Sequence, residues 1–336
     1  MIIKQLNPLA FQVYCKKITT DSRVKMHTNN TEQAWYILGT GAIGTLWAAK
    51  FLQHSIPCRL LHRSTPEQSG DVISRKLNLI GLDDHQHSYD LVSESIYCNG
   101  EINRILVCTK SYQCIAAIEP LIPRLCDAAT ILILQNGMGQ QQELARMLPK
   151  QQILLASTTE AAMIKSPLEV KHTGSGISSF GCLDHSTQIS PDITAQLKRI
   201  NMQQEQNIEA VLWSKLSVNC VINPLTAIHN CRNGQLLQNP KLLSLTQQLC
   251  TEVEAVTTAM DKPIKAAGLF DKVRIVATAT SQNYSSMQQD IQYERNTEID
   301  FINGYLQQHA DRLNIPCPLN RQIISQIKQL ELSHYP

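Results

Sequence analysis

Three polar side chains recur four residues apart in an otherwise apolar stretch, Leu212 to His229. They are Lys215, Asn219 and Asn223. Because an α-helix turns by about 100° per residue, residues four apart share one face, so the stretch predicts a buried helix with one polar stripe. A buried ammonium or carboxamide is costly without a partner. The stripe should therefore face a wet cleft or a ligand, where an ammonium can donate a proton; a purely structural polar network is the alternative.

A glycine-rich turn, GTGAIG, follows the first predicted strand, Ala34 to Leu38. In a strand–turn–helix unit, the first glycine permits a tight turn, the second lets the backbone approach a pyrophosphate, and the third lets the helix pack on the strand. The N–H groups of the helix N-terminus then bind phosphate. A turn without a ligand is the alternative. The expected dinucleotide-binding residues are Gly39, Thr40, Gly41, Ala42, Ile43 and Gly44.

The end of the second predicted strand, Cys58 to His62, indicates which dinucleotide binds. An NAD-binding unit normally carries Asp or Glu about 20 residues beyond the glycines, where it accepts hydrogen bonds from the ribose. This chain instead has His62, Arg63 and Ser64. A cation at this position suits a 2′-phosphate, so Arg63 favours NADP(H) as the cofactor. A solvated surface arginine is the alternative.

Polar residues follow two further apolar runs, Ile105 to Cys108 and Ile131 to Leu134, which are typical of central parallel strands. Lys110 comes after the first run and Asn136 after the second. In a doubly wound sheet the carboxyl ends of the strands line the ligand crevice. We therefore expect both side chains near the cofactor, with ordinary loop polarity as the alternative.

The order of predicted elements divides the chain into two domains, since 336 residues exceed what one core usually holds. Residues 34–207 alternate strands and helices, which is typical of a Rossmann-type doubly wound α/β sheet that binds NADP. Helical periodicity dominates residues 208–336, which predicts an all-α substrate and catalytic domain. Residues 1–33 show no periodicity and form an unassigned extension.

Several local expectations follow from the pattern. The pattern of residues 71–100 predicts a weak strand excursion or a hairpin. The segment from Thr158 to Ala162 is expected to form a connecting turn near the cofactor. Pro224 disfavours the α conformation at Asn223, so the first helix of the second domain should kink or end there. Further helices are expected over Leu236 to Met260, Val273 to Ala279, Glu298 to His309 and Arg321 to Leu332.

Composition excludes several classes of function. The 30 Lys and Arg nearly balance the 28 Asp and Glu, and no basic block interleaves with aromatic residues, so nucleic acid is not an expected partner. The 11 cysteines lack metal-ligand spacing and are expected to be reduced thiols of a cytoplasmic protein without a metal site. No apolar run approaches the length of a membrane span, so no membrane association is expected.

The segments LWSKLSVNCVINPLTAI, GTGAIG, NGMG and SSMQQDI…TEIDFINGY stand in the order seen in ketopantoate reductases, which residues 34–330 resemble. The resemblance implies NADPH-dependent reduction of 2-dehydropantoate to (R)-pantoate in pantothenate biosynthesis. It also implies a Rossmann domain followed by a helical domain, with the active site between them. One departure is TTEAA at residues 158–162, where members of the family commonly place His or Gly beside the turn.

The resemblance further implies roles for individual residues. Lys215 matches the proton donor of the family and Glu298 its substrate-anchoring carboxylate, although Glu298 is also a candidate for the ion-pair partner that keeps Lys215 charged. The substrate contacts implied are Asn219, Asn223, Asn233, Asn283, Ser285 and Ser286. The cofactor contacts implied are Gly39 to Gly44, Arg63, Lys110, Asn136 and Ala162.

Two other functions remain open from the sequence. The first is an NADPH-dependent reductase of another 2-oxoacid on the same scaffold, because pocket shape rather than motif decides which acid enters. The second is a non-catalytic NADPH-binding sensor, against which the lysine stripe argues because binding alone needs only the first domain. The sequence is compatible with a monomer or a homodimer.

Overall fold

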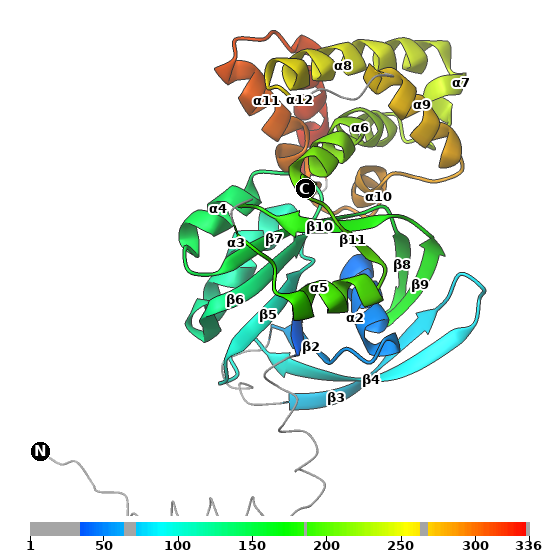
Figure 1. Cartoon of the computed structure of the whole chain (residues 1–336). Coiled ribbons are helices and arrows are strands. Elements are labelled where there is room, and N and C mark those ends of the chain that lie inside the picture. The colour runs from blue at the N-terminus through cyan, green and yellow to red at the C-terminus, as the bar shows by residue number, and fades with distance from the viewer. Residues whose placement is uncertain (1–33, 64–71, 185–186, 263–267, 334–336) are drawn as a thin grey trace, which may run out of the picture.

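The computed structural model describes residues 34–63, 72–184, 187–262 and 268–333. A domain built on a large sheet carries a helical domain stacked on it (Figure 1). The predicted extension, residues 1–33, lies outside the described residues.

The first domain is an 11-stranded sheet in the order β11-β10-β7-β6-β5-β1-β2-β4-β3-β9-β8. Its centre, from β7 to β4, is entirely parallel, as in a doubly wound fold. The strands are β1 (Trp35–Leu38), β2 (Cys58–His62), β3 (Val72–Ile80), β4 (Gln86–Ser95), β5 (Ile102–Val107), β6 (Leu125–Leu134), β7 (Gln152–Thr158), β8 (Ala161–Ser166), β9 (Glu169–Gly174), β10 (Ser178–Cys182) and β11 (Met202–Gln204).

Antiparallel pairs complete both edges of this sheet. The hairpin predicted within residues 71–100 is confirmed as β3 and β4. A second hairpin, β8 and β9, pairs with β3 and packs against helix α2 (Ala42–Gln53), so the sheet curls around that helix (Figure 1). The turn expected over Thr158 to Ala162 is shorter than predicted, because Thr158 ends β7 and β8 begins at Ala161.

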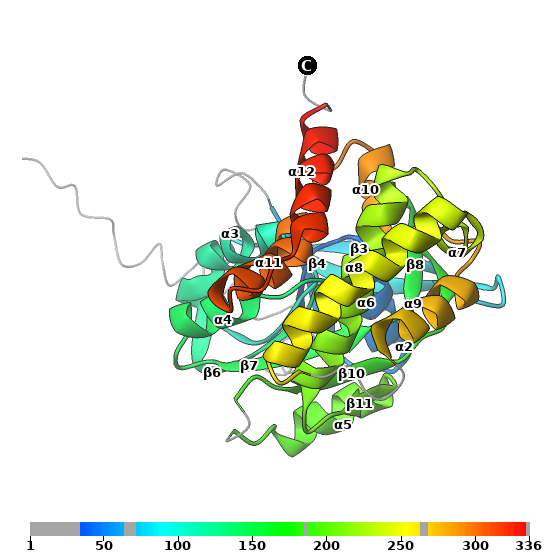
Figure 2. The same ribbon diagram turned by 90° about the horizontal axis from the view of Figure 1, so that it is seen from above.

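Helices cover the sheet and form the second domain. The first domain contains, besides α2, helices α3 (Cys114–Ile118), α4 (Gln140–Met147) and α5 (Pro191–Arg199). In the second domain α8, α9 and α12 pack around α6, and α8 crosses over α6 when the molecule is seen from above (Figure 2). The second domain consists of α6 (Ile208–Ile228), α7 (Gln235–Gln238), α8 (Pro240–Ala259), α9 (Gly268–Ala279), α10 (Ser286–Gln292), α11 (Asn303–Arg312) and α12 (Pro318–Leu332).

Of the two outcomes expected at Asn223, a kink or an end, the end is wrong, because helix α6 continues through Pro224 to Ile228. Proline lacks the N–H that would bond the carbonyl four residues earlier, which here belongs to Cys220. The side chain of Asn303 replaces that donor, because its Nδ2 lies 2.8 Å from the Cys220 oxygen. Asn303 is fully buried. A neighbouring helix thus satisfies the group that the proline leaves without a partner.

Two predicted helices are divided. The run from Leu236 to Met260 breaks at Asn239, whose side chain caps α8 by accepting a 2.9 Å hydrogen bond from the N–H of Lys241. The run from Glu298 begins with a short 3₁₀ turn, Ile299–Phe301, before α11. Glu298 therefore precedes a 3₁₀ turn and does not lie in an α-helix.

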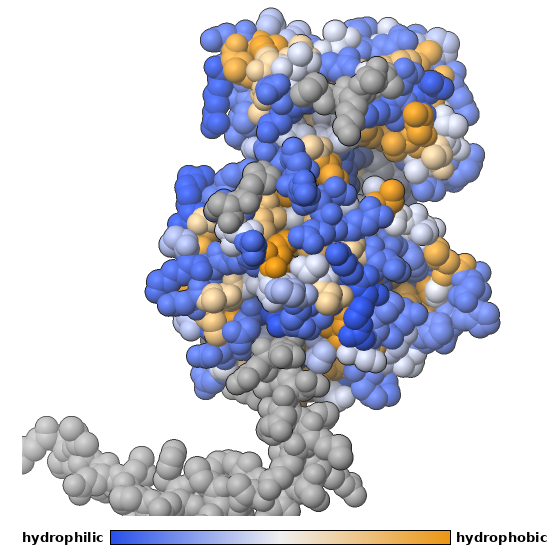
Figure 3. Space-filling model, viewed as in Figure 1, coloured by the Kyte–Doolittle hydropathy of each residue, from blue (hydrophilic) through white to orange (hydrophobic). Residues whose placement is uncertain are grey.

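The apolar helix α6 is long and apolar enough to span a membrane by length and composition, contrary to the expectation from the sequence. Its most apolar window is 67% buried inside the protein, which is typical of a core helix. The surface in Figure 3 is mostly hydrophilic and narrows between the two domains. The cysteines among the described residues are all free thiols.

Candidate active site

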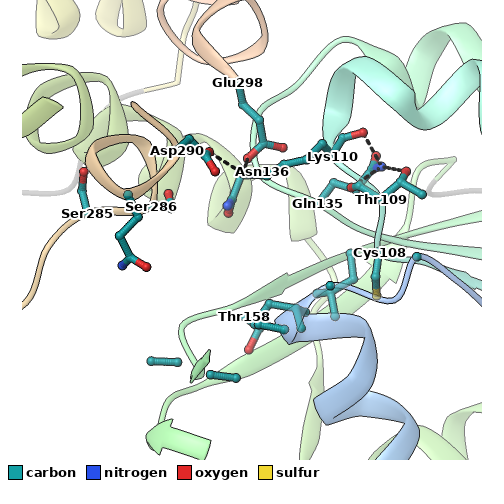
Figure 4. A pocket seen from close by; sticks show the side chains of 18 of the residues that line it. Cys108, Thr109, Lys110, Gln135, Asn136, Thr158, Ser285, Ser286, Asp290 and Glu298 are labelled. Carbon is teal, nitrogen blue, oxygen red and sulfur yellow. Dashed lines mark hydrogen bonds and ion pairs between the residues drawn. The ribbon is translucent and has the colours of Figure 1, made fainter. Parts of the chain in front are cut away.

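A cavity of about 1510 Å³ lies between the two domains and runs from the glycine turn to α6 and α10 (Figure 4). Most of the residues singled out in the sequence line it together, although they come from distant segments. They are Gly39, Thr40, Gly41, Ala42, Ile43, Arg63, Lys110, Asn136, Ala162, Lys215, Asn219, Asn223, Asn233, Asn283, Ser285, Ser286 and Glu298. Gly44 is absent from this wall because it packs against the backbone of Gly39.

The glycine turn has the shape that a pyrophosphate requires. Gly39 has φ = +111°, which favours glycine. A Cβ on Gly41 would meet nothing within 4 Å, so the backbone there is open to the cavity, whereas a Cβ on Gly44 would lie 1.9 Å from the Gly39 oxygen. No side chain caps α2, and its first turn has no acidic residue. Its N–H groups are therefore available to an anion.

Arg63 lies directly after β2 and is exposed at the wall of the cavity. His62, at the end of the same strand, also lines the cavity, but its Nε2 is buried and has no hydrogen-bond partner among the described residues. The guanidinium of Arg63 is therefore the cationic group at the end of β2 that can bind a ligand. It is suited to a phosphate because it presents several N–H donors in one plane.

The ammonium of Lys215 reaches from α6 across to the first domain. Its Nζ lies 2.9 Å from Oδ1 of Asn136 and 2.7 Å from the carbonyl oxygen of Thr158, at the end of β7. Burial lowers the pKa of Lys215 to about 8, while the negative charge of Glu298 opposes that shift. Neither bonded oxygen carries a formal charge, so the ammonium is desolvated without a contacting counter-ion. Such a group can give up a proton near neutral pH.

Glu298 is buried and bonds the first domain rather than Lys215. Its Oε1 accepts hydrogen bonds from the backbone N–H of Ser111 at 3.0 Å and from the Ser111 hydroxyl at 2.6 Å. Its Oε2 lies 3.7 Å from Nζ of Lys110. The interpretation of Glu298 as the contacting ion-pair partner of Lys215 is therefore wrong, because Glu298 acts on that lysine only through its field.

Lys110 forms its close ion pair with a residue that the sequence did not reveal. Its Nζ lies 2.5 Å from Oδ2 of Asp290 on α10 (Figure 4). Asp290 also contacts Arg295 at 3.2 Å. Burial lowers the pKa of Lys110, but the charges of Glu298 and Asp290 outweigh it and raise the pKa. Burial raises the pKa of Asp290, against the effect of Lys110.

Three polar groups of the site were missed in the sequence. The Thr158 carbonyl had no signal, because a backbone oxygen is present in every residue. Ser111 stands next to Lys110, and Asp290 lies one helical turn after Ser286 in the SSMQQDI segment. That spacing was a usable signal, since residues four apart share a helix face.

The expected substrate contacts differ in whether their side chains already form hydrogen bonds within the protein. Asn219 and Asn223 continue the α6 stripe along the cavity wall. Asn233 donates a 2.9 Å hydrogen bond to Thr280, while its Oδ1 is buried without a hydrogen-bond partner in the described part of the chain.

The residues at the start of α10 show the same difference. Ser285 caps α10, and its hydroxyl bonds that of Thr226 at 2.7 Å, so it is committed to the fold. Ser286 and Asn283 are exposed in the cavity. Within the described ranges there is no group of three His, Cys, Asp or Glu residues able to hold a metal ion.

Comparison with known proteins follows the same two-part organisation. Residues 35–185 match the family model described as "Ketopantoate reductase PanE/ApbA", and residues 207–331 match its C-terminal model. The chain is also similar to the 2-dehydropantoate 2-reductase of Vibrio cholerae serotype O1. These two are 34% identical over 301 residues, which cover 88% of this chain and 97% of the relative.

Two solved structures show the same fold. D-mandelate dehydrogenase, solved with NADH and anilino(oxo)acetate, superposes with a TM-score of 0.79 at 19% identity and covers 90% of this chain and 100% of its own. A dimeric ketopantoate reductase from Staphylococcus aureus gives 0.72 at 20% identity, over 90% and 99%. The predicted fold class, a Rossmann-type α/β domain followed by an all-α domain, is thereby confirmed. The chain belongs to the ketopantoate reductase PanE/ApbA family of oxidoreductases.

Proposed function

We propose that this protein catalyses the NADPH-dependent reduction of 2-dehydropantoate to (R)-pantoate, the step that pantothenate biosynthesis requires. The observation that carries the proposal is the position of Lys215, whose ammonium, with a pKa of about 8, stands in the cleft between the glycine turn and the asparagine stripe. Roughly one third sequence identity to a 2-dehydropantoate 2-reductase over most of the chain supports it.

The reaction needs few groups from the chain. A nicotinamide held at this site would supply a hydride to the carbonyl carbon, which would leave negative charge on the carbonyl oxygen. Lys215 stabilises that charge and donates a proton to the oxygen. Its low pKa makes the transfer favourable near neutral pH. Asn136 and the Thr158 carbonyl hold the ammonium in place, because each accepts one of its N–H bonds.

The remaining polar residues are proposed to bind the substrate. Asn219, Asn223 and Ser286 offer hydrogen-bond donors to the substrate carboxylate without adding another charge. Glu298 is proposed to accept a hydrogen bond from the 4-hydroxyl group. Its carboxylate is already held by Ser111. Glu298 is therefore a specificity element rather than the acid. Asn233, Asn283 and Ser285 complete the proposed substrate contacts.

NADP(H) is the proposed cofactor. The pyrophosphate would lie against Gly39, Gly41 and the N-terminus of α2, and Arg63 would bind the 2′-phosphate. Lys110, Asn136 and Ala162 are the other proposed cofactor contacts. The D-mandelate dehydrogenase structure contains NADH, so the preference of this chain is a separate question that Arg63 should decide.

Another 2-oxoacid is the second candidate substrate. A D-mandelate dehydrogenase shares the fold, and pocket shape rather than the lysine selects the acid. The dimeric state of the Staphylococcus aureus reductase favours a homodimer among the two states that the sequence allows. We further propose a cytoplasmic location, which the free thiols support.

The experiment that tests the proposal is an assay of NADPH oxidation with 2-dehydropantoate and with 2-oxoisovalerate, which lacks the hydroxymethyl group. We expect a higher kcat/KM for 2-dehydropantoate in the wild type, and a smaller difference in Glu298→Gln, because a charge-assisted hydrogen bond is about twice as strong as a neutral one. Parallel titrations with NADH and NADPH in Arg63→Ala test the cofactor. Absence of turnover with both acids would favour the sensor.

A further inference from the structure

A second cavity, of about 750 Å³, lies on the other side of Lys215. Its walls come from α6 and α9 of the helical domain and from β7 and β10 of the sheet. Its volume falls within the range of ligand cavities, about 300–1,000 Å³. The family motifs quoted above assign no function to it.

The lining of this second cavity suits an apolar group. Val211 and Trp213 of α6, Ile177 before β10 and Ile275 of α9 form much of it. Ile275 of α9 is 60% exposed, and apolar surface is visible at the right of the helical domain in Figure 3. Hydrophobic and aromatic side chains with a few hydroxyl groups are typical of a site for an apolar or aromatic group.

Two lysines that line the second cavity, Lys262 and Lys272, are engaged with their neighbours. Nζ of Lys262 lies 2.9 Å from a carboxylate oxygen of Glu209, and Nζ of Lys272 donates a 3.2 Å hydrogen bond to Ser214. Lys262 therefore has a counter-ion, and Lys272 is held against α6. The cavity offers a ligand apolar area rather than a site built for an anion.

The two cavities are adjacent and share five lining residues. Thr159, Lys215, Val218, Asn219 and Val276 line both. The hydrogen bond from Lys215 to the end of β7 crosses the cleft at this place. Beside it, Val276 is 37% exposed, and it is the α9 side chain that both cavities share. A molecule whose carbonyl group reaches Lys215 therefore has an apolar space within reach past this valine.

We propose that the second cavity is a subsite for the side chain of bulky apolar 2-oxoacids, such as those carrying an aryl or long alkyl group, and that Val276 controls access to it. This inference rests on the proposed reduction of 2-oxoacids. The chemistry is unchanged: the carbonyl carbon gains a hydride from NADPH, the oxygen gains a proton from Lys215, and a 2-hydroxyacid and NADP⁺ are formed.

The test compares two substrates, 2-dehydropantoate and 2-oxo-4-phenylbutanoate. It uses one variant that reduces the second cavity and one that widens the access to it. Ala210 is exposed and lines the second cavity only, so Ala210→Phe adds a ring at the wall of this cavity and none at the first. We expect the ratio of kcat/KM for the aryl acid to that for 2-dehydropantoate to fall at least about tenfold, the scale of one misplaced apolar group in a pocket. Val276→Ala should raise the same ratio about tenfold.

The matched control is Ala195→Phe, the same exchange at an exposed alanine of α5 that lines neither cavity. It should leave both kcat/KM values unchanged. Binding supplies a readout without turnover. Trp213 lines the second cavity, whereas Trp35 and Trp47 lie in a separate hydrophobic core. Addition of the aryl acid to the enzyme with NADP⁺ should therefore change the indole emission in the wild type but not in Ala210→Phe.

The outcomes separate this proposal from the proposed function. If Ala210→Phe and Ala195→Phe shift the ratio equally, or if the emission change persists in Ala210→Phe, the second cavity is not the subsite. If 2-dehydropantoate is reduced but the aryl acid neither binds nor reacts, the subsite alone is refuted. If neither acid is reduced but the aryl acid changes the emission of the wild type only, the subsite stands and the proposed reaction fails.

Discussion

At the residue scale, two opposing effects set the pKa of the Lys215 ammonium. Burial disfavours its charge and lowers the pKa to about 8, whereas the negative charge of Glu298 favours it. Its hydrogen-bonding partners are neutral oxygens, so neither locks the proton on Nζ. The ammonium is therefore predominantly protonated at neutral pH and still acidic enough to be an effective donor.

This pKa predicts how activity depends on pH. The protonated form of Lys215 is the proposed donor and predominates below about pH 8. We expect kcat/KM for 2-oxoacid reduction to be level just below that value and to fall about tenfold per pH unit above it. Steady-state rates between pH 6 and pH 10 measure the profile. A profile that stays level to pH 10 would exclude Lys215 as the titrating donor.

Removal of the amine gives a second prediction. Lys215→Ala should lower kcat by about 10²- to 10⁴-fold, the usual loss on removing a general acid, while NADPH still binds. Lys241→Ala, at an exposed lysine of α8, is the matched control and should retain wild-type turnover. Stopped-flow reduction and cofactor fluorescence measure the two quantities. Near wild-type turnover in Lys215→Ala would assign proton donation to another group.

The sequence predicted the positions of most side chains around this lysine. Periodicity placed Lys215 and Asn219 on one stripe, and the rule that strand ends meet at one edge placed Lys110 and Asn136 at the same cavity. It did not predict that Lys110 pairs with Asp290, because no periodicity links residues on elements of different domains. The roles of these residues remain proposals.

At the element scale, α6 shows how tertiary contacts override a local rule. Pro224 removes the hydrogen bond to the carbonyl of Cys220, yet the helix continues because Asn303 donates to that oxygen at 2.8 Å. The same amide donates to Oδ1 of Asn320 at 2.9 Å. The unbroken helix carries both Lys215 and Asn223, which line the same cavity. The polar stripe of α6 therefore depends on the hydrogen bond that Asn303 of α11 donates to Cys220.

This dependence predicts the effect of Asn303→Leu. The exchange leaves buried oxygens of Cys220 and Asn320 without their donor, so the free energy of unfolding should fall by about 2–4 kcal/mol. Pro224→Ala returns an N–H to the carbonyl of Cys220. In the double variant the loss should be smaller by about 1 kcal/mol. Urea denaturation of the four proteins measures the coupling; strictly additive losses would show that Asn303 does not replace the missing donor.

Elements with a strong burial pattern were predicted well. β1 is wholly buried, and so is the part of β6 from Ile131 to Leu134; both appear in the sequence as short apolar runs. β8 is largely exposed, and its sequence AAMIKS does not alternate apolar and polar residues, so neither it nor β9 was predicted. The error at Pro224 has a different cause, since the compensating donor lies far along the chain.

At the scale of the whole molecule, polar bonds between the domains surround the cavity. Lys215 bonds Asn136 and Thr158, Glu298 bonds Ser111, and Lys110 pairs with Asp290. Asp290 is 3% exposed. Because these bonds join residues of both domains, the relative position of the two domains and the geometry of the site are set by the same contacts.

Lys110→Met tests this arrangement. It leaves the buried carboxylate of Asp290 with Arg295 alone, so the free energy of unfolding should fall by about 1–3 kcal/mol, less than for a fully buried pair because Lys110 is partly exposed. Lys150→Met breaks an exposed pair with Asp127 and should cost less than about 1 kcal/mol. Urea denaturation compares the two. Equal losses would show that the interdomain pair contributes no more than a surface pair.

The curled sheet has a consequence for folding. The β8–β9 hairpin follows β7 directly in the chain but pairs with β3, near the opposite edge of the sheet. The hairpin cannot pair with β3 and pack against α2 until both of these elements have formed, and such long-range pairings form slowly. In pulsed hydrogen exchange, the amides of β9 should become protected after those of β5 and β6. Thr158 ends β7 immediately before the turn to β8, so the far end of that turn, beside the second acceptor of Lys215, is fixed only when the domain is nearly complete.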